Sequence, residues 1–168
     1  GSDGNFYGTT PYGGADDQGT IFRITAEGVL TTLFEFGRND NGSLPYAALV
    51  QGNDGDFYGT THLGGIGYGT AFKITPDGEL TTLAQFTGVE GPSSAALVLG
   101  SDGNFYGTTP FGGADNQGTI FRMTAEGVLM TLFEFSGTGA ANVGAFPDGA
   151  LVLSSSGDFY GTTNRGGF

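Results

Sequence analysis

The chain has no cysteine, no tryptophan, one histidine and only 5 basic residues among 168. Without cysteine it can form no disulfide and perform no thiol chemistry. With 17 acidic residues its formal net charge is −12, which disfavours nucleic-acid phosphates and anionic membrane surfaces as partners. The one histidine, His62, has no second histidine and no cysteine beside which to bind a metal or form a triad, so we expect a structural or solvent-exposed role.

Long hydrophobic runs are also missing. No segment approaches the roughly 18 apolar residues of a membrane span, so we expect no membrane insertion. The abundant residues are glycine (34) and phenylalanine (15), with 7 tyrosines. This much glycine indicates many turns, and the regularly placed aromatic residues can supply a core, so the composition is typical of a turn-rich β protein.

A repeat organises the sequence. The string Gly-x-Phe-Tyr-Gly-Thr-Thr recurs, and residues 1–36 and 100–135 differ at only four positions. A fuller unit continues with a Gly-Gly loop, Gly-Thr-x-Phe-Arg/Lys-x-Thr, Leu-x-Thr-Leu-x-x-Phe and Ala-Leu-Val. The Phe-Tyr pair lies at Phe6-Tyr7, Phe57-Tyr58, Phe105-Tyr106 and Phe159-Tyr160.

Each unit is predicted to contain four strands, because Thr, Val, Ile, Phe and Tyr favour strands and no helical periodicity competes. Short Gly-containing turns connect the first strand to the second and the third to the fourth. The first strand is expected at 47–52, 95–100 and 150–154, and the second at 5–10, 56–61, 104–109 and 158–163. The third is expected at 19–25, 69–75 and 118–124, and the fourth at 29–36, 79–86 and 128–135.

These strands predict an all-β fold of tandem four-stranded antiparallel meanders, as in β-propeller blades, with an open β stack or solenoid as the alternative. The expected units are 1–46, 47–94, 95–149 and a partial 150–168. Residues 1–14 and 155–168 occupy the same part of the repeat, so the two ends duplicate each other. We therefore expect the chain to be part of a larger propeller or to assemble with copies of itself.

Candidate binding residues lie on what we call the long-loop face, which carries the longer connections within and between units. These connections are residues 11–18, 37–45, 62–68, 87–94, 110–117 and 136–147. Oxygen-rich, Gly-containing loops can bind calcium, although turn chemistry explains the same residues. Two aromatic residues there can stack on sugars. The candidates are Asp16, Asp17, Asp40, Asp115, Asn116, Tyr12 and Phe111, and Asn41 begins a glycosylation sequon.

The repeat resembles the Gloeobacter/Verrucomicrobia (GloVer-type) tandem repeat of bacterial proteins. The residues that carry the resemblance are 3–10, 13–14, 19–25 and 30–33, and the match recurs along nearly the whole chain. The resemblance implies secreted or surface-anchored proteins and supplies no catalytic residues. The strand order is also similar to that of NHL-type and gluconolactonase-type propellers, a likeness of architecture only.

We therefore expect a non-enzymatic, extracellular module on a bacterial surface, with a structural, assembly or adhesive role and no required cofactor. Its expected partners are copies of itself, further repeats or glycans. One alternative is a glycan- or calcium-dependent binding propeller that uses the long-loop face. The other is a lactonase-like or lyase-like propeller enzyme, for which the sequence shows no convergent set of catalytic residues.

Overall fold

The computed structural model describes residues 1–37, 41–93, 95–137 and 144–166, in which all regular structure is β-strand. Nowhere in these described ranges is there a helix long and apolar enough to cross a membrane. The strands are β1 (Phe6–Thr10), β2 (Thr20–Ile24), β3 (Leu30–Glu35), β4 (Val50–Gln51), β5 (Phe57–Thr60), β6 (Thr70–Ile74), β7 (Leu80–Gln85), β8 (Val98–Leu99), β9 (Phe105–Thr109), β10 (Thr119–Met123), β11 (Leu129–Glu134), β12 (Val152–Leu153) and β13 (Phe159–Tyr160).

The strands form four antiparallel sheets in chain order: β1-β2-β3, β4-β5-β6-β7, β8-β9-β10-β11 and β12-β13. We call these sheets blades 1 to 4. Each lies within one of the predicted repeat units, and the predicted all-β meander is confirmed. The first strand of each unit is shorter than expected. In blade 2, for example, β4 pairs only Val50 and Gln51 with β5, where the sequence predicts a strand at 47–52.

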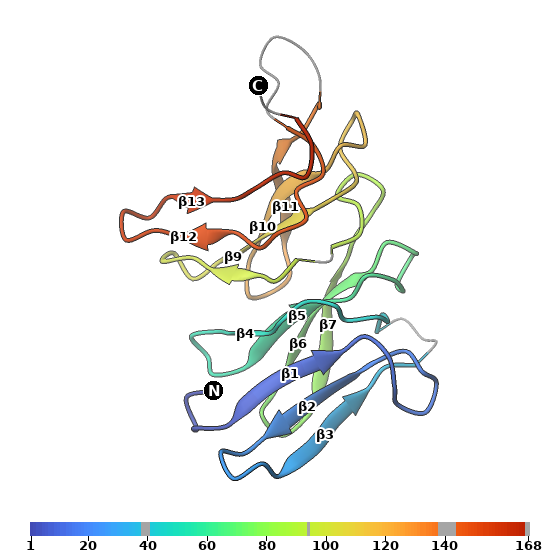
Figure 1. The fold of residues 1–168 in the computed structure, drawn as a ribbon, viewed down its shortest axis with the longest axis vertical. Helices are drawn as coiled ribbons and strands as arrows, with labels where there is room; N and C mark the ends of the chain where they lie inside the picture. The colour runs from blue at the N-terminus through green and yellow to red at the C-terminus, as the bar shows by residue number, and fades with distance from the viewer. Residues whose placement is uncertain (38–40, 94, 138–143, 167–168) are drawn as a thin grey trace.

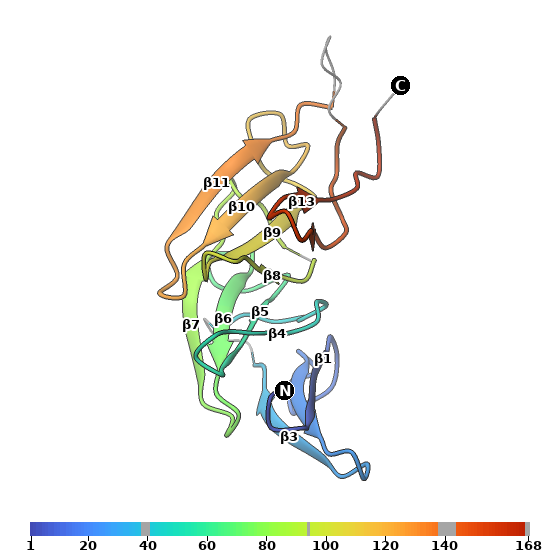
Figure 2. The ribbon, with the colours of Figure 1, turned by 90° about the vertical axis from the view of Figure 1, so that its left-hand side faces the viewer.

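The blades follow one another along the long axis of the molecule (Figure 1). Strands β4 and β8, the first strands of blades 2 and 3, contact each other. Figure 2 shows these strands on one side of the molecule and the last strands, β7 and β11, on the opposite side. This fan of meanders is the arrangement of propeller blades.

The core consists of two apolar clusters, one on each side of blade 2. Because successive side chains of a strand point to opposite faces, the neighbours Ala71 and Phe72 enter different clusters, and both are fully buried. The first cluster joins blades 1 and 2 through Ile21, Phe36, Phe57, Phe72 and Ile74. The second joins blades 2 and 3 through Tyr58, Ala71, Phe86, Leu97, Phe105, Phe121 and Met123.

The Phe-Tyr pair of the repeat links each blade to the next. The tyrosine ring of one blade packs against the phenylalanine ring of the following blade, and the contact occurs three times, stacked in the first two pairs and tilted in the third. The ring centroids are 3.9 Å apart for Tyr7–Phe57, 4.0 Å for Tyr58–Phe105 and 4.2 Å for Tyr106–Phe159.

The glycine after each Phe-Tyr pair leaves room for an aromatic ring of its own blade. A Cβ atom added at Gly107 would lie 2.6 Å from Cζ of Phe121, whose side chain is fully buried and cannot move aside. The equivalent distances are 2.6 Å from Gly8 to Phe22 and 2.7 Å from Gly59 to Phe72. The motif therefore needs glycine for packing, in addition to any effect on the backbone.

We expect Gly107→Ala to lower the free energy of unfolding by about 1–3 kcal/mol, because overpacking a closed core costs this much. Urea denaturation of the variant measures it. Gly149→Ala is the matched control, since a Cβ there makes only an ordinary 3.4 Å contact and the equivalent residues before blades 2 and 3 are Ala47 and Ala95. Equal stability of the two variants would contradict the packing role of Gly107.

In each of the first three units, an aspartate in the turn before the second strand accepts a hydrogen bond from a tyrosine in that strand. In blade 2 the Tyr58 hydroxyl donates to Oδ2 of Asp54 over 2.8 Å, and Lys73 Nζ lies 3.1 Å from Oδ2 of Asp56. Burial, and then the hydrogen bond to Asp54, raise the pKa of Tyr58 well above the ordinary tyrosine value of about 10. The folded state therefore keeps this phenol protonated.

The raised pKa of Tyr58 gives stability that is fully present below pH ~10 and is lost as the pH rises above it, because only the unfolded chain then releases the proton. Thermal unfolding between pH about 9 and 11 should show a falling melting temperature, and the fall should be shallower in Tyr58→Phe. Return to neutral pH should restore both proteins. An equally steep fall in the variant would show that Tyr58 does not contribute to the alkaline loss.

Candidate functional site

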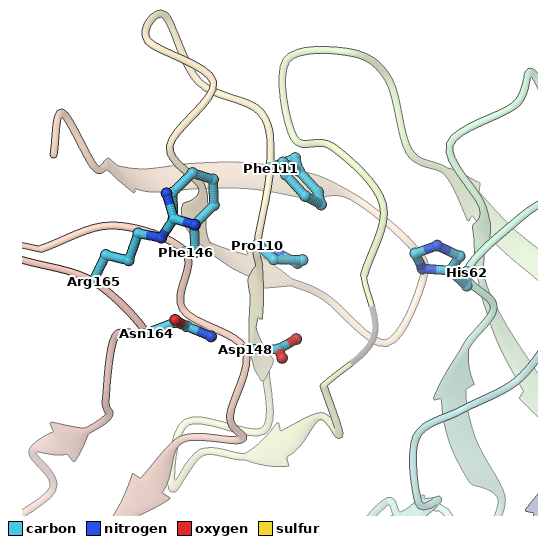
Figure 3. A pocket seen from close by; sticks show the side chains of 7 residues that line it. All are labelled: His62, Pro110, Phe111, Phe146, Asp148, Asn164 and Arg165. Atoms are coloured by element: carbon cyan, nitrogen blue, oxygen red, sulfur yellow. The ribbon is translucent and has the colours of Figure 1, made fainter.

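A cavity of about 430 Å³ opens between the connections of blades 2, 3 and 4. Its lining residues come from the long-loop face or directly follow its connections, and Figure 3 shows their side chains. His62 stands at one side and Arg165 at the other, with Pro110 and Phe111 between them. Among the described residues, the lining side chains are those of His62, Pro110, Phe111, Phe146, Asp148, Asn164 and Arg165.

The backbone around Phe146 holds blades 3 and 4 together at the cavity. Phe146 has φ of +55°, a left-handed conformation that is uncommon for a bulky residue. In this conformation its N–H donates to the Gln117 carbonyl over 2.7 Å, and its carbonyl accepts from Asn164 N–H over 3.0 Å. Leu44 has the same conformation, φ +57°, at the equivalent place between blades 1 and 2, so the geometry recurs at a second junction between blades.

Aromatic rings form the apolar wall of the cavity. The rings of Phe111 and Phe146 meet edge to face with centroids 5.6 Å apart. The Arg165 guanidinium lies 5.3 Å from the centroid of the Phe146 ring, a cation–π distance. This contact leaves the guanidinium N–H donors available to another partner.

The polar groups of the wall are largely uncommitted. Within the described ranges, the side chains of Asp148, Asn164 and Arg165 take part in no hydrogen bond or ion pair. His62 makes an edge contact with the Tyr46 ring, with centroids 5.7 Å apart. The cavity thus offers a carboxylate acceptor, an amide with both functions and a guanidinium donor beside aromatic surface.

Of the residues predicted from the sequence, Phe111 lines this cavity and Tyr12 does not. Tyr12 occupies the equivalent position in blade 1, where its hydroxyl lies 3.2 Å from that of Tyr46 and its ring remains 58% exposed. The two aromatic candidates are therefore not brought together.

Asp17 and Asn116 act within their own turns. Both have a left-handed backbone, with φ of 54° and 51°. The Asp17 carboxylate accepts from Gly13 N–H over 2.8 Å, and the Asn116 carboxamide oxygen accepts from Gly112 N–H over 2.9 Å. Because an acid and an amide make the same hydrogen bond at equivalent positions, both residues stabilise their turns.

The remaining predicted residues are dispersed. Asp16 and Asp115 are exposed in equivalent loops of blades 1 and 3, and Asp40 lies outside the described residues. The Asn41 carboxamide oxygen accepts from the Thr82 hydroxyl over 3.2 Å, so the proposed glycosylation acceptor is engaged within the protein. In the described part of the chain, no group of three or more His, Asp or Glu side chains is placed to hold a metal ion.

Sequence reasoning did not select Asp148, Asn164 and Arg165, and it assigned His62 no binding role. The sequence did contain an indication of some of these lining residues. His62, Pro110 and Asn164 occupy one equivalent position, directly after the Thr-Thr pair that recurs in each unit. The two nearly identical units have proline here (Pro11 and Pro110), whereas the second and fourth units have His62 and Asn164. Asp148 and Phe146 carried no comparable signal, since the connection that holds them varies throughout.

We expect Asp17→Ala to lower the free energy of unfolding by about 1 kcal/mol, through loss of the bond to Gly13 N–H. Asp17→Asn should keep wild-type stability, because Asn116 makes the same bond in blade 3. Thermal unfolding with and without millimolar calcium measures both effects. A melting temperature that rises with calcium in the wild type and not in Asp17→Asn would identify a calcium site in place of a turn.

The fold and the cavity define a β-propeller-like repeat module. The chain belongs to the Gloeobacter/Verrucomicrobia repeat family, whose model matches residues 1–168. Among solved structures it is similar to a putative gluconolactonase, with a TM-score of 0.59 and 17% sequence identity. The match covers 95% of this chain and 57% of the other, so the chain spans little more than half of that protein. No curated protein matches the chain.

Proposed function

We propose that the chain is a non-enzymatic, adhesive binding module of a bacterial surface, and that its cavity takes a saccharide unit. The observation that carries the proposal is the combination of the Phe111 and Phe146 rings with the uncommitted side chains of Asp148, Asn164 and Arg165. Concave sites with apolar walls and a few convergent polar groups are the usual form of a small-molecule site.

The chemistry of the wall suits a sugar better than an apolar or a simple ionic ligand. A pyranose ring has an apolar C–H face that can pack on an aromatic ring and a rim of hydroxyls that donate and accept. The planar groups of Asp148, Asn164 and Arg165 offer both acceptors and donors to such a rim. A carboxylate and a guanidinium in one cavity also favour a neutral polyol over an ion of either sign.

Binding is favoured over catalysis because, among the described lining residues, Asp148 is the single carboxylate. Glycoside hydrolysis ordinarily uses a pair of carboxylates, one on each side of the bond that breaks. The similar solved structure is titled a putative gluconolactonase, which makes sugar-lactone hydrolysis the second candidate function. An extracellular location is part of the proposal and is compatible with the acidic, cysteine-free composition.

Screening on a glycan array, followed by calorimetric titration of the best saccharide, tests the proposal. We expect Phe111→Ala and Arg165→Ala each to weaken binding about tenfold or more, because each removes one part of the cavity wall. Tyr12→Ala is the matched control, since it removes the equivalent aromatic residue outside the cavity and should leave the affinity unchanged.

Three results would contradict the proposal. Absence of binding to any saccharide would show that saccharides are not the ligand. Equal weakening of saccharide affinity by Tyr12→Ala would show that the cavity is not the binding site. Gluconolactone hydrolysis well above the spontaneous rate, lost in Asp148→Asn, would replace the binding role with the enzymatic one.

A further inference from the structure

We infer that the Asp148-Gly149 pair beside the cavity is a modification site, at which the folded protein converts aspartate to isoaspartate without an enzyme. The reaction needs an aspartyl carboxyl group that can turn toward the main-chain nitrogen of the next residue. Glycine favours the reaction as that next residue, because it has no Cβ to hinder the approach. The inference does not depend on which ligand the cavity takes.

The reaction balances with water as its single co-reactant. The nitrogen of Gly149 bonds to Cγ of Asp148, and one carboxyl oxygen leaves as water with the proton of the N–H and the proton of the carboxyl group. Water then opens the five-membered succinimide ring. Opening at Cγ restores aspartate, whereas opening at the main-chain carbonyl carbon gives isoaspartate, in which the main chain runs through Cβ and Cγ. The mass is unchanged, and the main chain is one carbon longer.

The main-chain nitrogen distinguishes this pair from the other Asp-Gly pairs of the chain. In four of the pairs the glycine N–H donates within a tight turn to the carbonyl three residues earlier, over 2.9 to 3.1 Å. The N–H of Gly149 donates to no acceptor in the described part of the chain. The four pairs with an engaged N–H are 3–4, 54–55, 77–78 and 102–103.

The carboxylate distinguishes the pair as well. Asp3, Asp54 and Asp102, which we call the tyrosine-bonded aspartates, each accept a hydrogen bond of 2.8 Å from a tyrosine hydroxyl. Hydrogen bonds to an ionised group are strong, and this bond must break before the carboxyl group can turn to the main chain. Asp77 lacks such a bond but keeps the engaged glycine N–H. Asp148 is exposed and has neither restraint among the described residues.

The product would differ from aspartate in the wall of the cavity. The Gly149 carbonyl accepts from the Thr108 hydroxyl over 3.1 Å, and two main-chain hydrogen bonds hold Phe146. Isoaspartate inserts its extra main-chain carbon between these two attached residues, and its carboxylate is bonded directly to Cα. The modification therefore moves the carboxylate of the cavity and disturbs the segment that attaches blade 4 to blade 3.

Peptide mapping of the folded protein, fresh and after weeks at neutral pH and physiological temperature, tests the inference. Trypsin cuts after Arg122 and Arg165, so the peptide 123–165 contains one Asp-Gly pair, and electron-transfer fragmentation distinguishes isoaspartate from aspartate. We expect isoaspartate to form at Asp148 about tenfold or more faster than at the tyrosine-bonded aspartates, because breaking a hydrogen bond to a charged group slows the reaction by about this factor. The rate at Asp77 should lie between them.

Two controls separate the effect of the fold from that of the sequence. In concentrated urea all five pairs should react at similar rates, because the protecting hydrogen bonds are lost. Gly149→Ala should slow the reaction at residue 148 in the folded and the unfolded chain, since its Cβ hinders the nitrogen while making only an ordinary contact of 3.4 Å.

Equal rates at Asp148 and the tyrosine-bonded aspartates in the folded protein would overturn the inference. A faster reaction at Asp148 that persists in urea would also overturn it, because the local sequence and not the fold would then set the rate. So would a rate at residue 148 that Gly149→Ala leaves unchanged, since the attack would then not come from this nitrogen.

Discussion

The structure depends on one constraint: blade 2 is apolar on both faces, so each of its faces must be covered by a neighbouring sheet. Ala71 and Phe72 show this directly, because they are adjacent in β6, point to opposite sides and are both fully buried. A fully buried Phe or Leu side chain contributes about 1.5–3 kcal/mol, so the two clusters beside blade 2 are the main source of stability. The repeat and the order of the blades follow from this constraint.

Because both faces of the strands are committed to packing, chemistry is confined to the connections. The strands of blades 1 and 3 are nearly identical in sequence, whereas the connections that follow their last strands, 37–45 and 136–147, differ in length and polarity. The cavity occurs where these differences concentrate, between His62, Phe111 and Arg165, which follow the second strands of three successive blades. A scaffold of constant strands with variable connections allows a new site to arise without disturbing the core.

Much of the fold could be predicted from the sequence, because the strand and turn residues are local and recur. Two features could not. The pairing of the third and fourth strands shifts at Ile21/Phe22, Ala71/Phe72 and Ile120/Phe121, and such a bulge depends on the packing of neighbouring strands. The cavity combines residues from three blades, which no local pattern reports. Asp17 was predicted as a binding residue because it is an acidic residue in a loop. Its left-handed backbone and its hydrogen bond to Gly13 N–H show that it stabilises the turn.

The connection that contains Phe146 both attaches blade 4 to blade 3 and shapes the cavity. Its left-handed backbone costs of order 1–3 kcal/mol for a non-glycine residue, and it persists because hydrogen bonds to Gln117 and Asn164 fix it from both sides. The same conformation directs the Phe146 ring to Phe111 and to the Arg165 guanidinium. The bonds that attach blade 4 to blade 3 therefore also position the aromatic wall of the cavity, so a substitution that breaks them should change both the packing of the blades and the shape of the site.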